Sequence, residues 1–273
     1  MCRHVGYLGP PVALDELLLR PSHSLLEQSW APADMRRGGT VNVDGFGVGW
    51  YRSDRPEPGR YRACGPMWAD ENFAALAPDI SSGALVGAVR SATKSTPVVR
   101  TACAPFQSGH WLFSHNGSVP GWPESLSELV EKLDTTRLLA LDAPVDSAAV
   151  WALLLRRLDD GQSPADAVRD TLVEVVRAVP DARMNLLLSD GDLLIATTWT
   201  HALSVCRTDN AVIVASEPFG VPAVARGAPP DTTGEPHWQA VPDGYLVVAD
   251  RVETSLVPLP EIELRDSPPS ESR

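Results

Sequence analysis

Apolar positions in the first third of the chain alternate in short runs, which is typical of β-strands that are half buried. Such runs cover residues 2–8, 46–51, 61–64 and 85–92, and the last of them is rich in small residues. We expect residues 46–51 and 61–64 to pair with each other. Residues 12–19 have the spacing of a brief helix that ends before Pro21, and residues 21–44 read as a loop.

The middle of the chain changes to the spacing of amphipathic helices. Apolar residues repeat at helical intervals after Pro123, after Asp146 and after Ser163-Pro164. Strand patterns then return over residues 184–188, 193–198, 203–206, 212–215 and 245–248, with a hairpin signal at Asp190-Gly191. Strands, then helices, then strands again predict an α+β fold with two sheets and helices stacked outside them.

The chain of 273 residues is 44% hydrophobic, enough to bury a large core. We expect one domain over residues 1–257 and a flexible tail over residues 258–273, with a polar loop at 227–236. No internal repeat is visible. A formal net charge of −12 argues against nucleic acid and anionic membrane surfaces as partners and favours a small molecule, while a homo-oligomer stays open.

Two further patterns concern location and cofactors. No apolar run approaches the ~20 residues of a membrane span, and charged residues and prolines interrupt the N-terminal segment, so we expect a cytoplasmic protein. The cysteines, at positions 2, 64, 103 and 206, lack the C-x-x-C spacing of zinc or redox sites. We therefore expect no cofactor and no metal, and we expect the three cysteines other than Cys2 to be buried.

Cys2 is the strongest candidate for chemistry because it becomes the N-terminal residue once Met1 is removed. An α-amino group generally has a pKa of about 7.7 to 8.0, close to the value of about 8.5 for a thiol. The same residue can therefore supply both a nucleophile and the base that activates it. The alternative is an ordinary second residue that happens to be cysteine.

Other segments could complete an amide-cleaving site. Asn116-Gly117 offers a side-chain amide and an unshielded backbone N–H as oxyanion donors, although the same dipeptide favours a hairpin turn. Arg90, at the end of a small-residue strand, could clamp a carboxylate or form a structural ion pair. Asp146 precedes a helical pattern. It could be the N-cap of that helix, or it could hold a substrate ammonium group. The glycine-dense residues 44–50 lack a phosphate-binding pattern, so close backbone approach is the better interpretation.

The chain resembles the class II glutamine amidotransferases over most of its length. The resemblance rests on five features that occur in the family's order: Cys2, residues 44–50, Arg90 with Thr93, Asn116-Gly117 and Asp146. The resemblance implies a four-layer αββα sandwich of the N-terminal nucleophile type, with Cys2 as nucleophile. It also implies roles for the other matching residues: Asn116 and Gly117 as oxyanion donors, Arg90 and Thr93 on a substrate α-carboxylate, Asp146 on its α-amino group, and His115 and Ser147 in the same γ-glutamyl site.

Two departures from the family pattern bear on the substrate. Ser91 and Lys94 stand where members linked to a synthase tend to carry Trp and His, and no synthase domain is expected in the chain. Hydrolysis of a γ-glutamyl amide is then the simpler reaction. Ser216-Glu217-Pro218 resembles the stand-alone branch of the family. Residues 2–9, together with residues 44–50 and 90–93, are most similar to the members that act in ergothioneine biosynthesis. That likeness implies release of glutamate from γ-glutamyl-hercynylcysteine S-oxide through a Cys2 thioester.

Alternatives of other classes stay open. One is a γ-glutamyl peptide hydrolase or glutaminase subunit of other specificity. Another is a non-catalytic binding protein of the same fold. A third is a metal protein that uses the scattered His4, His115, His201 and His237, which lack a metal-binding spacing.

Overall fold

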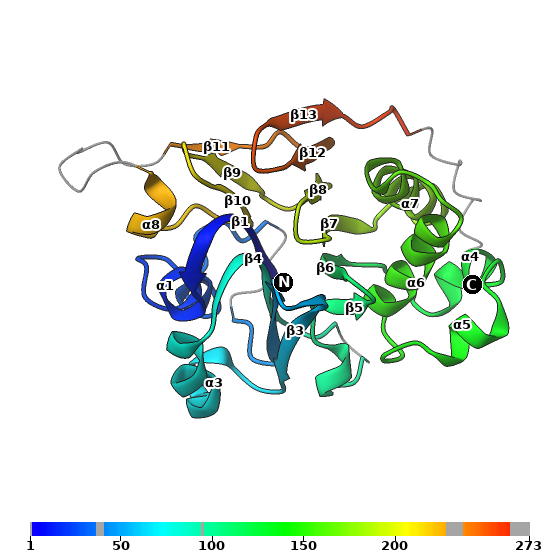
Figure 1. Cartoon of the computed structure of the whole chain (residues 1–273). Coiled ribbons are helices and arrows are strands. Elements are labelled where there is room, and N and C mark those ends of the chain that lie inside the picture. Colours follow the sequence, from blue (N-terminus) through cyan, green and yellow to red (C-terminus); the bar gives the residue numbers. More distant parts are fainter. Residues whose placement is uncertain (1, 37–40, 94–95, 228–236, 263–273) are drawn as a thin grey trace.

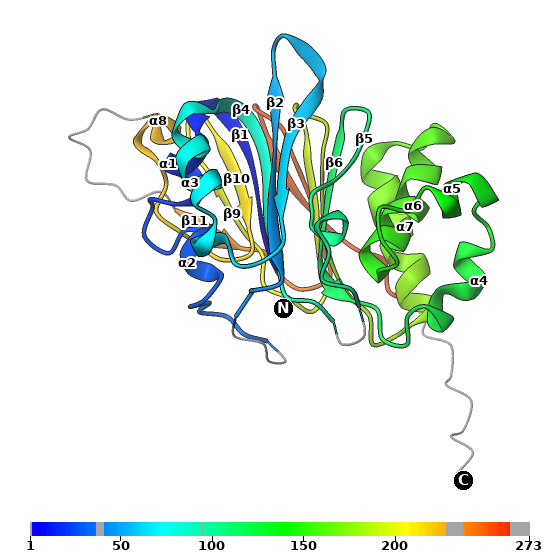
Figure 2. The same cartoon turned by 90° about the horizontal axis from the view of Figure 1, so that it is seen from below.

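Two antiparallel β-sheets face each other and carry helices on their outer surfaces, which confirms the expected α+β sandwich with αββα layers (Figures 1 and 2). The structure, a computed structural model, describes residues 2–36, 41–93, 96–227 and 237–262. Within these ranges no helix has the length and apolar character needed to cross a membrane.

The first sheet places the N-terminal strand at its centre. Its order is β11-β9-β10-β1-β4-β2-β3. Arg3 lies opposite Val89 of β4, so Cys2 sits directly at the end of this central strand. The strands of this sheet are β1 (Arg3–Ala13), β2 (Gly45–Arg52), β3 (Arg55–Ala63), β4 (Ser81–Arg90), β9 (Ser204–Arg207), β10 (Val212–Ala215) and β11 (Trp238–Ala240).

The second sheet has the order β13-β12-β8-β7-β6-β5. Its strands are β5 (Phe106–Ser108), β6 (Trp111–Ser118), β7 (Arg183–Ser189), β8 (Leu194–Thr198), β12 (Tyr245–Ala249) and β13 (Thr254–Pro258). Strand β6 pairs with β7 from Leu112 to Ser118, and Ser114 and His115 of β6 line the same cavity as Cys2.

Helices cover each sheet separately (Figure 2). The helices over the first sheet are α1 (Leu14–Leu18), α2 (Leu25–Gln28), α3 (Glu71–Leu76) and α8 (Ala223–Arg226). Those over the second are α4 (Ser127–Val130), α5 (Thr135–Leu139), α6 (Asp146–Asp159) and α7 (Pro164–Ala178). Four short 3₁₀ helices complete the described elements: η1 (Met67–Ala69), η2 (Ala77–Asp79), η3 (Arg100–Ala102) and η4 (Glu124–Leu126).

The two long helices form where local signals and packing agree. The Ser163 hydroxyl accepts the Asp166 N–H, and Pro164 occupies the first turn of α7, where a missing N–H costs nothing. The apolar faces of α6 and α7 bury residues such as Leu153 and Leu172 against the second sheet. Burial of these faces holds the helix layer on the sheet.

The glycine-dense strand β2 faces the other sheet at close range. A Cβ at Gly47 would lie 2.4 Å from the Ala104 carbonyl oxygen, and one at Gly49 would lie 2.6 Å from a Leu112 methyl carbon. At Gly47 glycine is therefore required by the close approach of another backbone segment, as predicted, and at Gly49 the strand packs closely against the Leu112 side chain of the second sheet.

Several expected elements have different bounds. Strand β1 continues to Ala13 through a register shift between Leu8 and Val12, so Val12 belongs to the strand and not to a helix. Helix α2 lies within residues 21–44, which we expected to be a loop. The helix expected after Pro123 divides into η4, α4 and α5. Short elements of four or five residues carry too few turns for periodicity to reveal them.

The two segments without expected regular structure fall partly outside the described residues. Of the polar loop at 227–236, only Gly227 is described, and it ends α8 with a left-handed φ of 74°. Of the tail at 258–273, Pro258 is the last residue of β13, and Leu259 and Ile262 pack against the core. The remaining residues, 228–236 and 263–273, lie outside the described part of the chain.

Candidate active site

Cys2 opens onto a small cavity between the ends of the two sheets. The side chains and backbone of Cys2, Arg90, Ser114, His115 and Ser147 contribute to its walls. The half-buried Cys2 thiol lies 3.8 Å from the Ser91 carbonyl oxygen, a long contact that leaves the sulfur free to face the cavity. The structure thus gathers the N-terminal thiol with residues from β4, β6 and α6.

Arg90 is the last residue of β4, and its guanidinium is buried beside the cavity. Asp44 fixes the local backbone, because its N–H donates to the Arg90 carbonyl and its carboxylate accepts the Ala92 N–H at 2.7 Å. Arg90 Nη2 donates to Thr96 Oγ1 at 3.4 Å, while Nη1 is buried with no partner among the described residues. An unpartnered guanidinium N–H at a cavity is a strong site for an anion.

Thr93 lies apart from this arrangement. Its side chain is exposed, and its carbonyl accepts hydrogen bonds from the N–H and the hydroxyl of Thr96. The structure therefore places Thr96, which sequence reasoning missed, in contact with Arg90. Lys94 lies outside the described residues.

Asn116 and Gly117 lie inside strand β6, so the expectation of a turn at this dipeptide is wrong. They pair with Asn185 and Met184 of β7. Asn116 Nδ2 lies 3.4 Å from Ser216 Oγ, and its buried Oδ1 has no partner in the described part of the chain. A Cβ at position 117 would fall 1.8 Å from the Arg183 carbonyl oxygen, so the strand pairing itself demands glycine there.

His115 joins the cavity wall to the first turn of α6. Its Nε2 lies 2.8 Å from the Arg183 carbonyl, which can only accept, so Nε2 carries the proton. Its Nδ1 is then free to accept from the Ser147 hydroxyl at 3.1 Å. Burial lowers the pKa of His115 below its ordinary value, and the neutral ring orients Ser147 toward the cavity.

Asp146 is buried behind this wall as the first residue of α6, while Val145 occupies the N-cap position. One carboxylate oxygen accepts the Val119 N–H and the other accepts the Ser147 N–H, both at 2.8 Å. Asp146 therefore joins the end of β6 to α6. Ser147 Oγ also lies 3.4 Å from Asp146 Oδ1. A carboxylate has about four lone-pair positions, so these three contacts leave capacity for one more donor.

His4 is buried between the sheets. From the sequence it is a candidate only for the metal alternative. Its Nδ1 lies 3.3 Å from Ser114 Oγ, and Nε2 has no partner among the described residues. Burial, with smaller contributions from His115 and Arg3, lowers the pKa of His4 to about 3. His4 is thus a neutral ring at neutral pH.

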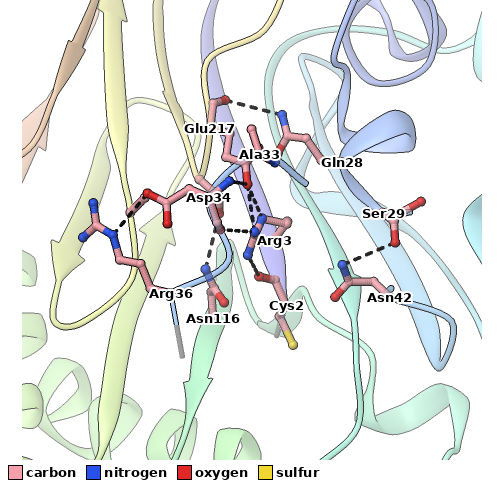
Figure 3. Close-up of polar contacts among 12 residues, drawn as sticks. Cys2, Arg3, Gln28, Ser29, Ala33, Asp34, Arg36, Asn42, Asn116 and Glu217 are labelled. Atoms are coloured by element: carbon pink, nitrogen blue, oxygen red, sulfur yellow. Dashed lines mark hydrogen bonds and ion pairs between the residues drawn. The ribbon is translucent and has the colours of Figure 1, made fainter. Parts of the chain in front are cut away.

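Arg3 and Glu217 form a buried ion pair, and the Cys2 sulfur points away from this pair (Figure 3). Arg3 Nη1 donates to the Cys2 carbonyl at 3.1 Å, and Arg3 Nε donates to Glu217 at 2.9 Å. Two signals in the sequence mark this pair: an arginine in the alternating run of β1, and the Ser216-Glu217-Pro218 stretch after β10.

The remaining cysteines and histidines do not form a metal site in the described residues. Cys103 and Cys206 are buried, but Cys64 is exposed, so the expectation that it would be buried is wrong. His4, His115 and His201 are buried, whereas His237 is exposed. No group of three or more His, Cys, Asp or Glu side chains in the described ranges could hold a metal ion.

Comparison with known proteins identifies the class to which this site belongs. The family model for class II glutamine amidotransferases matches residues 26–227. The chain therefore belongs to the class II glutamine amidotransferases, as the resemblance in its sequence implied.

Individual relatives cover nearly the whole chain. Proteins from Mycolicibacterium smegmatis and Mycobacterium tuberculosis, both named gamma-glutamyl-hercynylcysteine sulfoxide hydrolase, are each 37% identical over 95% of this chain, and the match spans 100% and 97% of their own lengths. A solved glutamine aminotransferase class-II domain protein from Silicibacter pomeroyi superposes with a TM-score of 0.65 at 22% identity, covering 95% of this chain and 100% of that one. This likeness supports the fold.

The buried neutral His4 predicts a pH-dependent stability. The unfolded chain binds a proton near the ordinary pKa of 6.5, but the folded pKa is about 3. The contribution of His4 to stability is therefore complete above pH 6.5 and falls as the pH drops toward 3, by about 1.4 kcal/mol per pH unit. Urea unfolding between pH 7 and pH 5 should show a steeper loss for the wild type than for His4→Gln. Equal slopes would contradict this, and His110→Gln, at an exposed histidine, is the control.

Proposed function

We propose that this protein hydrolyses the γ-glutamyl amide of γ-glutamyl-hercynylcysteine S-oxide to glutamate and hercynylcysteine S-oxide. The observation that carries the proposal is the identity of 37% over 95% of the chain with hydrolases of that name. The cavity supports it, because it brings a thiol at the second residue next to a buried guanidinium. The reducing cytoplasm would keep that thiol free.

The proposed reaction begins at the Cys2 sulfur. With Met1 removed, the Cys2 amine takes the thiol proton and the sulfur attacks the γ-carbonyl carbon. Asn116 Nδ2 and the Gly117 N–H stabilise the oxyanion. The C–N bond breaks as the leaving amine takes the proton from the Cys2 ammonium. Water then hydrolyses the glutamyl thioester and restores the thiol.

The glutamyl group would be held by its charged end. Arg90 Nη1, which has no partner among the described residues, binds the α-carboxylate, and Asp146 accepts from the α-ammonium group. His115 positions Ser147 on the same wall. A role for Thr93 on the carboxylate stays a prediction, and it would need the exposed side chain to turn inward.

A second candidate is a γ-glutamyl peptide hydrolase or glutaminase of other specificity. The residues assigned above bind only the glutamyl group and the amide of the substrate, so they would accept any γ-glutamyl compound. The leaving group must be recognised elsewhere. A non-catalytic binding protein of the same fold would keep the cavity without turnover.

Glutamate release from three substrates tests the proposal. We expect kcat/KM for γ-glutamyl-hercynylcysteine S-oxide to exceed that for glutamine and for a simple γ-glutamyl dipeptide by 100-fold or more, on the order of 3 kcal/mol of extra transition-state binding. Comparable rates on all three would support the second candidate. No release from any of them would support the binding protein.

An exposed aromatic corner offers a place for the leaving group. Trp30 and Trp68 are 42% and 43% exposed, and their rings meet edge to face with centroids 5.4 Å apart. Trp30 lies just before Ala33, which is tied to Glu217. Trp68 follows strand β3. The last residue of β3, Ala63, pairs with Phe46, and the neighbouring Gly45 pairs with Arg90. A trimethylammonium group is attracted to such rings.

Replacing both rings should separate recognition of the two substrate halves. For Trp30→Ala/Trp68→Ala we expect KM for the hercynyl conjugate to rise about 5- to 30-fold, the range of a cation–π contact, while KM for a γ-glutamyl dipeptide stays within 2-fold. Trp111→Ala is a matched control, since Trp111 begins β6 five residues before Asn116. An equal rise for both substrates would contradict the assignment.

A further inference from the structure

Glu217 collects an unusual number of donors for a buried carboxylate. Its side chain is 3% exposed and forms an ion pair with Arg3, itself 2% exposed. The N–H groups of Ala33 and Asp34 donate to its two oxygens at 2.8 and 3.1 Å, and His23 Nε2 lies 2.6 Å away. Burial alone would raise the pKa of Glu217, but these donors, led by the Ala33 N–H, hold it below its ordinary value.

Arg3 connects this carboxylate to the candidate nucleophile. Its guanidinium donates to the Cys2 carbonyl, to Glu217 and to the Asp34 carbonyl (Figure 3). The planar fork of the arginine therefore fixes three segments at once: the residue before β1, the loop after β10 and the segment around Asp34. Lysine could not make these contacts together.

The neighbouring Ser216 reaches the other side of the site. Its N–H donates to the His4 carbonyl, and its hydroxyl oxygen accepts the His4 N–H at 3.0 Å. The same oxygen lies 3.4 Å from Asn116 Nδ2, the proposed oxyanion donor. Two consecutive residues after β10 thus contact both the backbone beside the nucleophile and the amide that would bind the oxyanion.

We propose that Ser216-Glu217 is a positioning element that sets the distance between Cys2 and Asn116, Glu217 acting through Arg3 and Ser216 acting directly. This inference rests on the proposed role of Cys2 as nucleophile. Glu217 touches no reacting atom, so it is a positioning residue and not a catalytic one. It also neutralises Arg3, whose charge would otherwise act directly on the N-terminal residue.

Neutralising Glu217 changes the electrostatic environment of Cys2. A residue with a purely structural role would not have this effect. In Glu217→Gln the Arg3 guanidinium remains beside Cys2 without its counter-charge, and a nearby cation favours the thiolate. Arg90 and His115 line the cavity with Cys2, Cys103 is close enough to interact with Cys2 electrostatically, and these groups are unchanged in this variant. His23 contacts the other carboxylate oxygen of Glu217 in the wild type and is the remaining titratable neighbour of that residue among those described. The pH at which Cys2 becomes reactive should therefore fall.

The experiment measures kcat and the pH dependence of iodoacetamide alkylation at Cys2. Met1-processed protein with Cys64→Ser is used, because Cys64 is the other exposed or half-buried thiol. For Glu217→Gln we expect kcat to fall at least 10-fold with KM within 3-fold, and the alkylation midpoint to move down by about half a pH unit or more. In the double variant Arg3→Met/Glu217→Gln, the alkylation midpoint should return to the wild-type pH while kcat stays low.

Glu174→Gln is the matched control. Glu174 forms ion pairs with Arg157 and Lys132 in the outer helix layer, so its loss should lower stability without changing kcat or the midpoint. The proposal is overturned if Glu217→Gln behaves like Glu174→Gln. Should Glu217→Gln not fold, the double variant decides, because it carries no unpaired buried charge: a wild-type kcat overturns the proposal and a low kcat supports it.

The alkylation arm does not depend on the substrate. If the wild type releases no glutamate from any γ-glutamyl compound, the proposed function fails, and the midpoint shift between wild type and Glu217→Gln still decides whether Glu217 controls the charge at Cys2. An unchanged midpoint would then count against the positioning element itself.

Discussion

The structure depends on holding the second residue of the chain still at the end of a central strand. A chain terminus is ordinarily poorly ordered unless it is tied down. Here β4 pairs with β1 from Arg3 onward and β10 pairs with the other edge of β1 from Val5 to Leu8, while Ser216 bonds the His4 backbone on that second edge. The buried Arg3–Glu217 pair then fixes the carbonyl of Cys2, one residue beyond the sheet.

This constraint explains why so many polar groups are buried at one end of an otherwise apolar sandwich. A buried polar atom without a partner costs free energy, and Arg90 Nη1, Asn116 Oδ1 and His4 Nε2 are in that state within the described residues. Arg90 lines the cavity with Cys2, Asn116 contacts Ser216, and His4 follows Arg3 on the strand that begins after Cys2. In the proposed reaction, the substrate α-carboxylate supplies a partner for Arg90 Nη1, so the cost of leaving this donor open is recovered on binding.

The tight contact between the sheets also helps to hold the site around Cys2 in place. Glycines in β2 and at position 117 let backbones approach within distances that a side chain would block. Gly117 is required by the Arg183 carbonyl in the neighbouring strand, independently of any oxyanion. A residue that looks catalytic from its motif is here also a requirement of strand pairing, and only measurement separates the two roles.

The sequence predicted the sandwich and the helices α6 and α7 because the apolar periodicity of both helices is long, and α7 also has a local cap at Ser163. It could not predict α2 or α3, which span four and six residues, nor that Asn116-Gly117 would lie within a strand, because that depends on pairing with distant β7. Cys2, Arg90, His115 and Ser147 meet as expected, but the contact of Thr96 with Arg90 and the partners of Glu217 are tertiary. No spacing along the chain encodes them.

The most direct test of the central claim is where a covalent intermediate forms. Acid-quenched turnover of a γ-glutamyl substrate, followed by peptide mass spectrometry, should place a glutamyl thioester on Cys2, in protein whose Met1 has been removed. The Cys64→Ser variant should give the same adduct, since Cys64 is exposed and lies outside the cavity wall. An adduct on another residue, or full turnover in Cys2→Ala, would contradict the account.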